Sequence, residues 1–167
     1  MVVAPVHNMA LHKKAWDAAR SVPDPEIPVV TVEDLGILRS VTVEGKRAIA
    51  EVTPTYSGCP AVLAIELAVE ASLLDAGFEP EIRRVMSPSW TTDWITVEGR
   101  RKLKEYGIAP PVHASNSVRS LFGETQVQCP RCNSVDTTKL SEFGSTACKA
   151  LYQCQSCKEP FDYFKCI

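Results

Sequence analysis

Six of the seven cysteines lie in the last 39 residues, so thiol chemistry is concentrated at the C-terminus. Cys129-Pro130-Arg131-Cys132 is followed, after 21 residues, by Cys154-Gln155-Ser156-Cys157. Two Cys-x-x-Cys pairs at this separation are typical of a zinc ribbon. Each pair presents two sulfurs from one tight turn, and four thiolates can surround a metal tetrahedrally at about 2.3 Å. We therefore predict a metal site at Cys129, Cys132, Cys154 and Cys157, carried on neighbouring β-hairpins.

Zinc is predicted ahead of iron, in a structural role, because four protein ligands leave no open position for water or substrate. Disulfides are the rival interpretation. However, residues 1–8 lack the basic and apolar regions of a secretory signal, and thiols inside the cell stay reduced. About forty residues bury too little apolar surface to fold alone, so the metal would supply stability. Phe161, Tyr163 and Phe164 should pack over the site.

Cys148 and Cys166 fit neither pair. They could replace a ligand, or hold a second metal or a transient iron–sulfur cluster. Small buried residues beside the metal are the simpler interpretation of each. The sequence leaves both interpretations open.

Cys59 is the seventh cysteine, and it precedes an apolar segment at 61–76 that ends at Gly77. Pro60 suits the first position of a helix, which would place Cys59 at or beside the N-cap. Unpaired amides and the helix dipole favour a thiolate there. We predict a reactive or metal-binding Cys59, with a small buried cysteine as the alternative.

Asp24-Pro25-Glu26-Ile27-Pro28 is a second candidate segment, near the N-terminus. Its prolines, with Pro23, forbid a helix and fix an extended path. Glu26 is therefore held on a stiff loop. From this segment alone, a solvated turn carboxylate is the favoured interpretation.

The elements that would position these residues follow from periodicity. Helices are predicted at 9–22, 61–76 and 97–106, and strands at 38–43, 46–53 and 79–86. The helix at 61–76 is apolar almost all round and should be the central core helix. We predict an α+β fold: a small three-stranded mixed sheet with helices on one side, followed by a β zinc ribbon. The expected domains are 1–110 and 128–167, joined by a linker at 111–127.

Composition limits the function classes. The chain has 167 residues, of which 45% are hydrophobic, as in a globular protein. A formal net charge of −2 lacks the positive excess that binding a phosphate backbone requires. No apolar run approaches the ~20 residues of a membrane span. We expect a cytoplasmic protein with neither nucleic-acid nor membrane partners.

Taken together, these motifs resemble known families. The Asp24–Pro28 loop and the Thr55-Tyr56-Ser57-Gly58-Cys59-Pro60 turn, within about residues 9–106, resemble the SufT-like domain of iron–sulfur cluster assembly. With the ribbon and the segment Trp90-Thr91-Thr92-Asp93-Trp94-Ile95, nearly the whole chain resembles the PaaD family, also called PaaJ. These are small accessory proteins of the phenylacetyl-CoA epoxidase system.

The resemblance implies a non-catalytic accessory role in aerobic phenylacetate catabolism. Such a protein would help to mature the iron–sulfur or iron centre of the reductase or oxygenase component. Cys59 would bind or relay iron or a cluster, with Glu26 and Asp24 contributing carboxylates. One thiol cannot hold a cluster, so either a second copy of the chain or Cys148 and Cys166 of the ribbon must supply another, and a homodimer is the expected source. The alternative is a rubredoxin-like electron-transfer subunit, or a zinc-ribbon protein-interaction subunit, of the same complex.

Overall fold

The computed structural model describes residues 5–112 and 126–165, and only the backbone of residues 5–7. The chain divides into two compact units, Met1–Trp90 and Thr91–Ile167. Across these described residues, every helix is too short or too polar to cross a bilayer.

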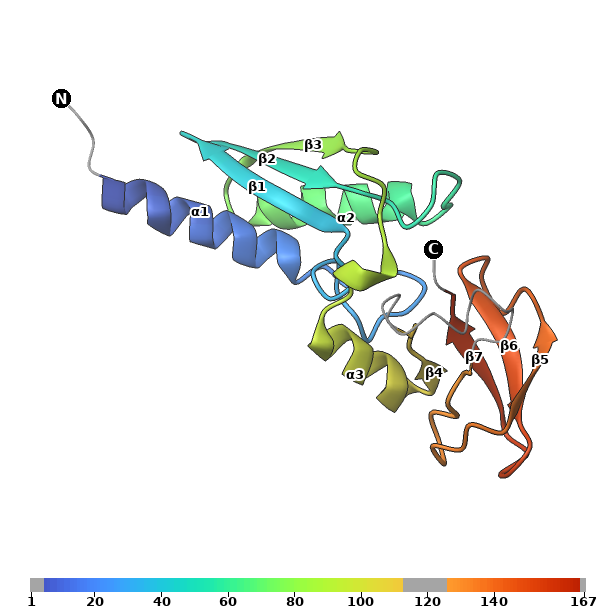
Figure 1. The fold of residues 1–167 in the computed structure, drawn as a ribbon. Coiled ribbons are helices and arrows are strands. Elements are labelled where there is room, and N and C mark those ends of the chain that lie inside the picture. The colour runs from blue at the N-terminus through green and yellow to red at the C-terminus, as the bar shows by residue number, and fades with distance from the viewer. Residues whose placement is uncertain (1–4, 113–125, 166–167) are drawn as a thin grey trace. The chain divides into compact units, whose positions relative to one another are not determined.

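The first unit is a three-stranded sheet with two helices. Its elements are α1 (Pro5–Arg20), β1 (Leu38–Glu44), β2 (Arg47–Val52), α2 (Val62–Asp75) and β3 (Glu79–Arg84). The strand order is β1-β2-β3. β2 pairs antiparallel with β1 and parallel with β3, so the predicted mixed sheet is confirmed. Both helices lie on the same side of the sheet (Figure 1).

Small side chains on β2 form the inner face of this sheet, as the alternating pattern predicts. Ala48, Ala50 and Val52 are all fully buried. The turn between β1 and β2 consists of Gly45 and Lys46, because Glu44 still pairs with Arg47. The predicted strands at 38–43 and 46–53 leave Glu44 and Gly45 as the connection, which is therefore wrong by one residue.

Two predictions about α2 were wrong. The helix begins at Val62 with Ala61 as its N-cap, so Pro60 is not its first residue. The Val62 amide instead donates to the Cys59 carbonyl at 3.3 Å, which closes a tight turn ahead of the helix. α2 is also not buried all round. Only Ile65, Val69 and Leu73 are buried in it, because the sheet and α1 cover one side of the helix.

The second unit contains a four-stranded sheet with a helix before it. Its elements are η1 (Thr92–Trp94), α3 (Val97–Tyr106), β4 (Ile108–Ala109), β5 (Thr137–Ser141), β6 (Lys149–Cys154) and β7 (Pro160–Phe164). The strand order is β4-β7-β6-β5. α3 matches the predicted helix and ends at Gly107, whose φ of 97° is left-handed.

The second unit starts earlier than the predicted ribbon boundary at residue 128. β4 pairs parallel with β7, so residues far upstream of the first cysteine complete the ribbon sheet. Val127, at the end of the predicted linker, is buried in the same core. Most of that linker, residues 113–125, lies outside the described residues.

Candidate functional site

The four predicted ligands come together in the second unit. The ligand atoms of Cys129, Cys132, Cys154 and Cys157 all lie within 4.8 Å of one another. The sulfurs of Cys129 and Cys157 are 3.8 Å apart, and those of Cys132 and Cys154 are 3.5 Å apart. A disulfide would require about 2.05 Å, so these cysteines are free thiols.

This geometry fits a tetrahedral metal. Four sulfurs at about 2.3 Å from a central ion are separated by about 3.8 Å along each edge of the tetrahedron. The Cys129–Cys157 and Cys132–Cys154 sulfur separations lie close to that value. A thiolate set of this size suits zinc, and all four corners are protein ligands.

The two Cys-x-x-Cys turns are near copies of each other. In each, the amide of the first cysteine donates to a carbonyl five residues later: Cys129 to Ser134 at 2.9 Å, and Cys154 to Glu159 at 3.0 Å. In each, the residue after the second cysteine is left-handed, with φ of 62° at Asn133 and 66° at Lys158. Both turns thus aim their two sulfurs inward by the same backbone path.

A glutamine before each pair holds the turn, which sequence reasoning missed. The Gln128 side-chain amide donates to the Asn133 carbonyl at 2.9 Å, and that of Gln153 donates to the Lys158 carbonyl at 3.2 Å. The repeated Gln-Cys-x-x-Cys pattern is the sequence signal that could have identified them.

Backbone amides prepare one of the four thiols to ionise. The N–H groups of Cys157 and Ser156 outweigh burial and lower the pKa of Cys154 to about 6. An amide of Glu159 also favours the Cys157 thiolate, but burial and the three neighbouring sulfurs outweigh it and raise the Cys157 pKa to about 12. Four crowded sulfurs cannot all carry negative charge unless a cation lies among them.

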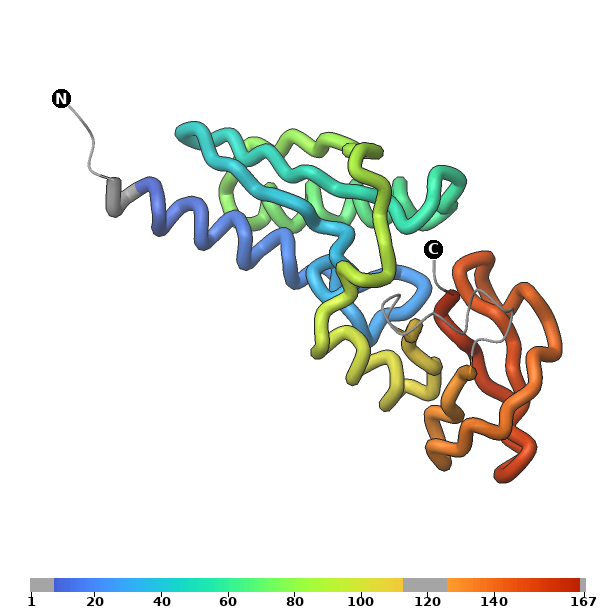
Figure 2. The backbone as a smooth tube through the Cα atoms, viewed as in Figure 1, coloured from blue at the N-terminus to red at the C-terminus, as the bar shows by residue number. Residues whose placement is uncertain are grey.

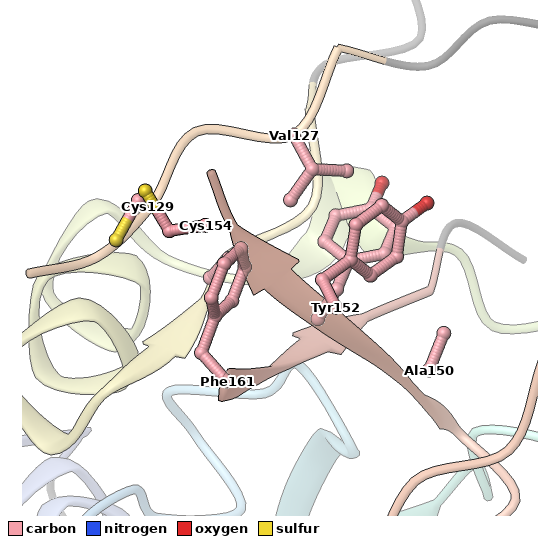
Figure 3. Close-up of a cluster of buried hydrophobic side chains, with 8 residues drawn as sticks. Val127, Cys129, Ala150, Tyr152, Cys154 and Phe161 are labelled. Atoms are coloured by element: carbon pink, nitrogen blue, oxygen red, sulfur yellow. The ribbon is translucent and has the colours of Figure 1, made fainter. Parts of the chain in front are cut away.

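An aromatic core supports the site. Tyr152 packs against Phe161 and Tyr163, with ring centroids 6.0 and 5.5 Å apart. Figure 3 shows the sulfurs of Cys129 and Cys154 together at one end of this cluster, with Phe161 beside them. Phe161 and Tyr163 belong to the same buried cluster as Cys129 and Cys154, whereas Phe164 is buried outside that cluster.

Cys148 lies away from the four ligands. It directly precedes β6, whereas Cys154 ends that strand, which places them about 20 Å apart along the chain. Cys148 is buried, and its sulfur lies 3.1 Å from the Thr146 hydroxyl. Cys166 falls outside the described residues, so its predicted role stays a prediction.

Cys59 is half-buried in the first unit, in the turn before α2. Its amide donates to the Tyr56 carbonyl at 3.2 Å. Cys59 therefore lies two residues before the N-cap Ala61 and not at the cap itself. Cys59 is thus accessible in part, which the predicted reactive or metal-binding role requires.

Asp24 and Glu26 have different environments. Asp24 is buried, and its Oδ1 accepts from the amides of Glu26 at 2.9 Å and Ile27 at 2.8 Å. The carboxylate thus shapes the loop that carries the exposed Glu26.

The Asp24–Glu26 loop and the Cys59 turn lie at the same end of the sheet. Leu38 pairs with Val52, and the Thr53 amide donates to the Ile37 carbonyl at 2.9 Å. The segment that precedes β1 and the segment that follows β2 are therefore joined at that end (Figure 2). Glu26 and Cys59 belong to these two segments.

Comparisons with known proteins match each unit separately. The family described as PaaD zinc beta ribbon domain matches residues 113–165. The family described as iron–sulfur cluster assembly protein matches residues 13–81. The two matches thus cover the four-cysteine site and the segment that contains Asp24, Glu26 and Cys59.

Whole-chain and structural relatives agree with these matches. A protein of Escherichia coli (strain K12), named as a 1,2-phenylacetyl-CoA epoxidase subunit, is 52% identical over 153 residues, which cover 91% of each chain. A crystal structure of a domain of unknown function, DUF59, from Bacillus anthracis is 25% identical with a TM-score of 0.55. It covers 60% of this chain and 97% of its own.

Proposed function

We propose that this chain, which belongs to the PaaD family of phenylacetyl-CoA epoxidase subunits, is a non-catalytic protein that helps to mature an iron centre of the epoxidase. The observation that carries the proposal is the pairing of two modules in one chain. An iron–sulfur assembly domain with a partly accessible cysteine is joined to a closed four-thiolate ribbon. The iron or cluster is cargo in this proposal, and the ribbon metal is a resident.

The two metal functions need different sulfur environments. Cys129, Cys132, Cys154 and Cys157 surround their site completely, which suits a structural zinc ion and leaves no coordination position for exchange. Cys59 lies partly exposed on a turn, so cargo bound there keeps open positions. Glu26, on a loop at the same end of the sheet, supplies a harder oxygen ligand that weakens retention of the cargo.

A second thiol is needed for a cluster, because one cysteine in this unit cannot hold it alone. We propose that a second copy of the chain supplies its own Cys59, which makes the working form a homodimer. The oxygenase and reductase components are the proposed partners, and the reductase is the first client to test.

Co-production of the oxygenase and reductase components tests the proposal. The chain would be omitted, supplied unchanged, or supplied as Cys59→Ala, and iron and acid-labile sulfide in the purified reductase would be measured. We expect both to fall when the chain is absent, and to fall as far with Cys59→Ala. Equal iron and sulfide in all three samples would exclude the maturation role.

An electron-transfer role is the second candidate, because the four-sulfur geometry would also accept iron. The two functions differ in the metal of the ribbon. Zinc with no visible absorbance in the purified chain would exclude rubredoxin-like electron transfer, whereas iron with strong visible bands would favour it.

A further inference from the structure

One side of α2 is apolar and exposed. Leu63, Leu67 and Leu74, which we term the leucine stripe, have exposed fractions of 60%, 56% and 54%. At about 100° per residue they fall within an arc of about 40° on the helix. Ile65, Val69 and Leu73 face the other way and are buried. The three leucines therefore lie along one line of α2 and are not scattered around it.

The residues on either side of the leucine stripe are alanines and acidic residues. Ala64, Ala68 and Ala71, all exposed, widen the apolar surface on one side. On the other side Glu66 is paired with Arg84 at 2.7 Å, and Glu70 follows it one turn later. Among residues 5–112 and 126–165, neither Glu70 nor the exposed Asp75 has an ion-pair partner.

Exposed leucines next to alanines and carboxylates indicate what kind of partner would bind to this side of α2. Leucines at spacings of four and seven residues are typical of a surface that binds another helix, and adjacent alanines let that helix approach closely. Acidic residues at the edge favour lysine or arginine on the facing edge of the partner. We propose that the leucine stripe docks an amphipathic helix of the client protein, with an apolar face flanked by basic residues.

Other occupants match the charges less well. A second copy of the chain would bring the same surface, with its own Glu70 and Asp75 and no basic residue of α2. A bilayer rich in anionic lipid would be repelled by the same carboxylates. A basic helix of another protein satisfies both the apolar and the acidic parts of the surface.

The position of the stripe connects it to the proposed cargo site. Leu63 lies in the first turn of α2, four residues after Cys59. A client held on α2 would therefore be anchored beside the sulfur that handles iron. This inference rests on the proposed function for the identity of the client, and it adds the surface and the chemistry of the contact.

Binding to the purified oxygenase and reductase components tests the docking surface. Leu63→Gln/Leu67→Gln replaces two exposed leucines with a residue of good helix propensity, so the fold and Tm should be unchanged. We expect the Kd for one component to rise at least tenfold. Leu140→Gln, at a leucine of similar exposure on β5, is the matched control and should leave the Kd unchanged.

The acidic edge is tested by charge reversal. Glu70→Lys should raise the Kd several-fold at low salt, and the difference should vanish in concentrated salt. Glu44→Lys, an exposed charge reversal at the hairpin, is the control. A Kd within twofold of the unchanged chain for both α2 variants, or an equal loss with the controls, would overturn the docking surface.

A photoreactive side chain at position 67 identifies the occupant in the same mixture. Cross-linking to a basic helix of either component supports the proposal, whereas cross-linking only to a second copy, or only within the chain, overturns it. Cys59→Ala separates the two proposals, because it should bind the client normally and fail to mature it. Normal maturation with Cys59→Ala, together with weak binding by the leucine variant, would remove the cargo role and keep the docking surface.

Discussion

Individual cysteines differ in what surrounds their sulfurs. Cys154 is buried and its sulfur accepts from the Cys157 amide at 3.5 Å, so the backbone already favours a thiolate before a metal arrives. Cys59 is half-buried on a turn, in a unit that lacks the paired turns of the ribbon. Residue type alone does not distinguish these two sulfur environments, whereas the local backbone does.

Metal binding should release a number of protons that depends on pH. The Cys154 pKa of about 6 means that this thiol is already ionised at pH 7.4 and is protonated at pH 5. Zinc binding at pH 5 should therefore release about one proton more per chain than at pH 7.4. Calorimetric titration of the metal-free chain in buffers of different ionisation enthalpy gives the count. An equal count at the two pH values would contradict this ionisation order.

Asp24 should matter to the fold through its loop. Asp24→Ala leaves the Glu26 and Ile27 amides without their acceptor, at a cost of about 1–2 kcal/mol in the free energy of unfolding. Asp24→Asn keeps an Oδ1 acceptor and should cost less than half as much. Urea unfolding of the two variants measures both values, and equal costs would show that the charge, not the hydrogen bonding, is required.

At the scale of elements, a glycine sets the loop between β5 and β6. The Gly144 amide donates to the Lys149 carbonyl at 2.7 Å. A Cβ at position 144 would lie 2.5 Å from Asp162 Oδ1 and 3.2 Å from the Cβ of Lys149. Asp162 cannot move away freely, because Ser145 donates to it at 3.0 Å and the buried Lys149 lies near it.

Gly144→Ala should therefore destabilise the second unit by about 1–3 kcal/mol through overpacking. Gly58→Ala is the matched control, since a Cβ there would meet nothing closer than 3.7 Å. Chemical denaturation with a probe in each unit measures both. A loss of less than about 0.5 kcal/mol for Gly144→Ala would mean that the loop adjusts without strain.

Elements with local signals were predictable from the sequence. The alternating pattern predicts β2 to within one residue at each end, and the glycine at position 107 marks the end of α3. The two-residue strand β4 has no pattern of its own and exists because β7 offers it an edge. The exposure of Leu63 and Leu67 was also out of reach, since apolar composition does not say how much neighbouring structure is available to cover a helix.

Some parts of the candidate site could likewise be predicted from the sequence, and others could not. Spacing was sufficient to predict that the four ribbon cysteines come together, because two Cys-x-x-Cys turns have few other uses in one chain. The hydrogen bonds of Asp24 depend on the path of the loop, which three prolines restrict without defining. The distance of Cys148 from the metal site follows from strand length, which requires the boundaries of β6.

At the scale of the whole molecule, metal should stabilise one unit only. The four ligands and the buried aromatic cluster belong to the second unit, and the first has its own core. A strong chelator should therefore remove amide hydrogen-exchange protection from β4, β6 and β7 while β1, β2 and β3 keep theirs. Loss of protection in both units together would show that they fold as one.

Metal content of the anaerobically reconstituted chain tests most directly whether one sulfur handles iron while four others hold a structural ion. The unchanged chain, Cys59→Ala, and the control Cys148→Ala would each be supplied with zinc, ferrous iron and sulfide and then desalted. We predict about one zinc per chain in all three, and iron in the unchanged chain and the control only. Iron retained by Cys59→Ala at the level of the unchanged chain would contradict the assignment of Cys59.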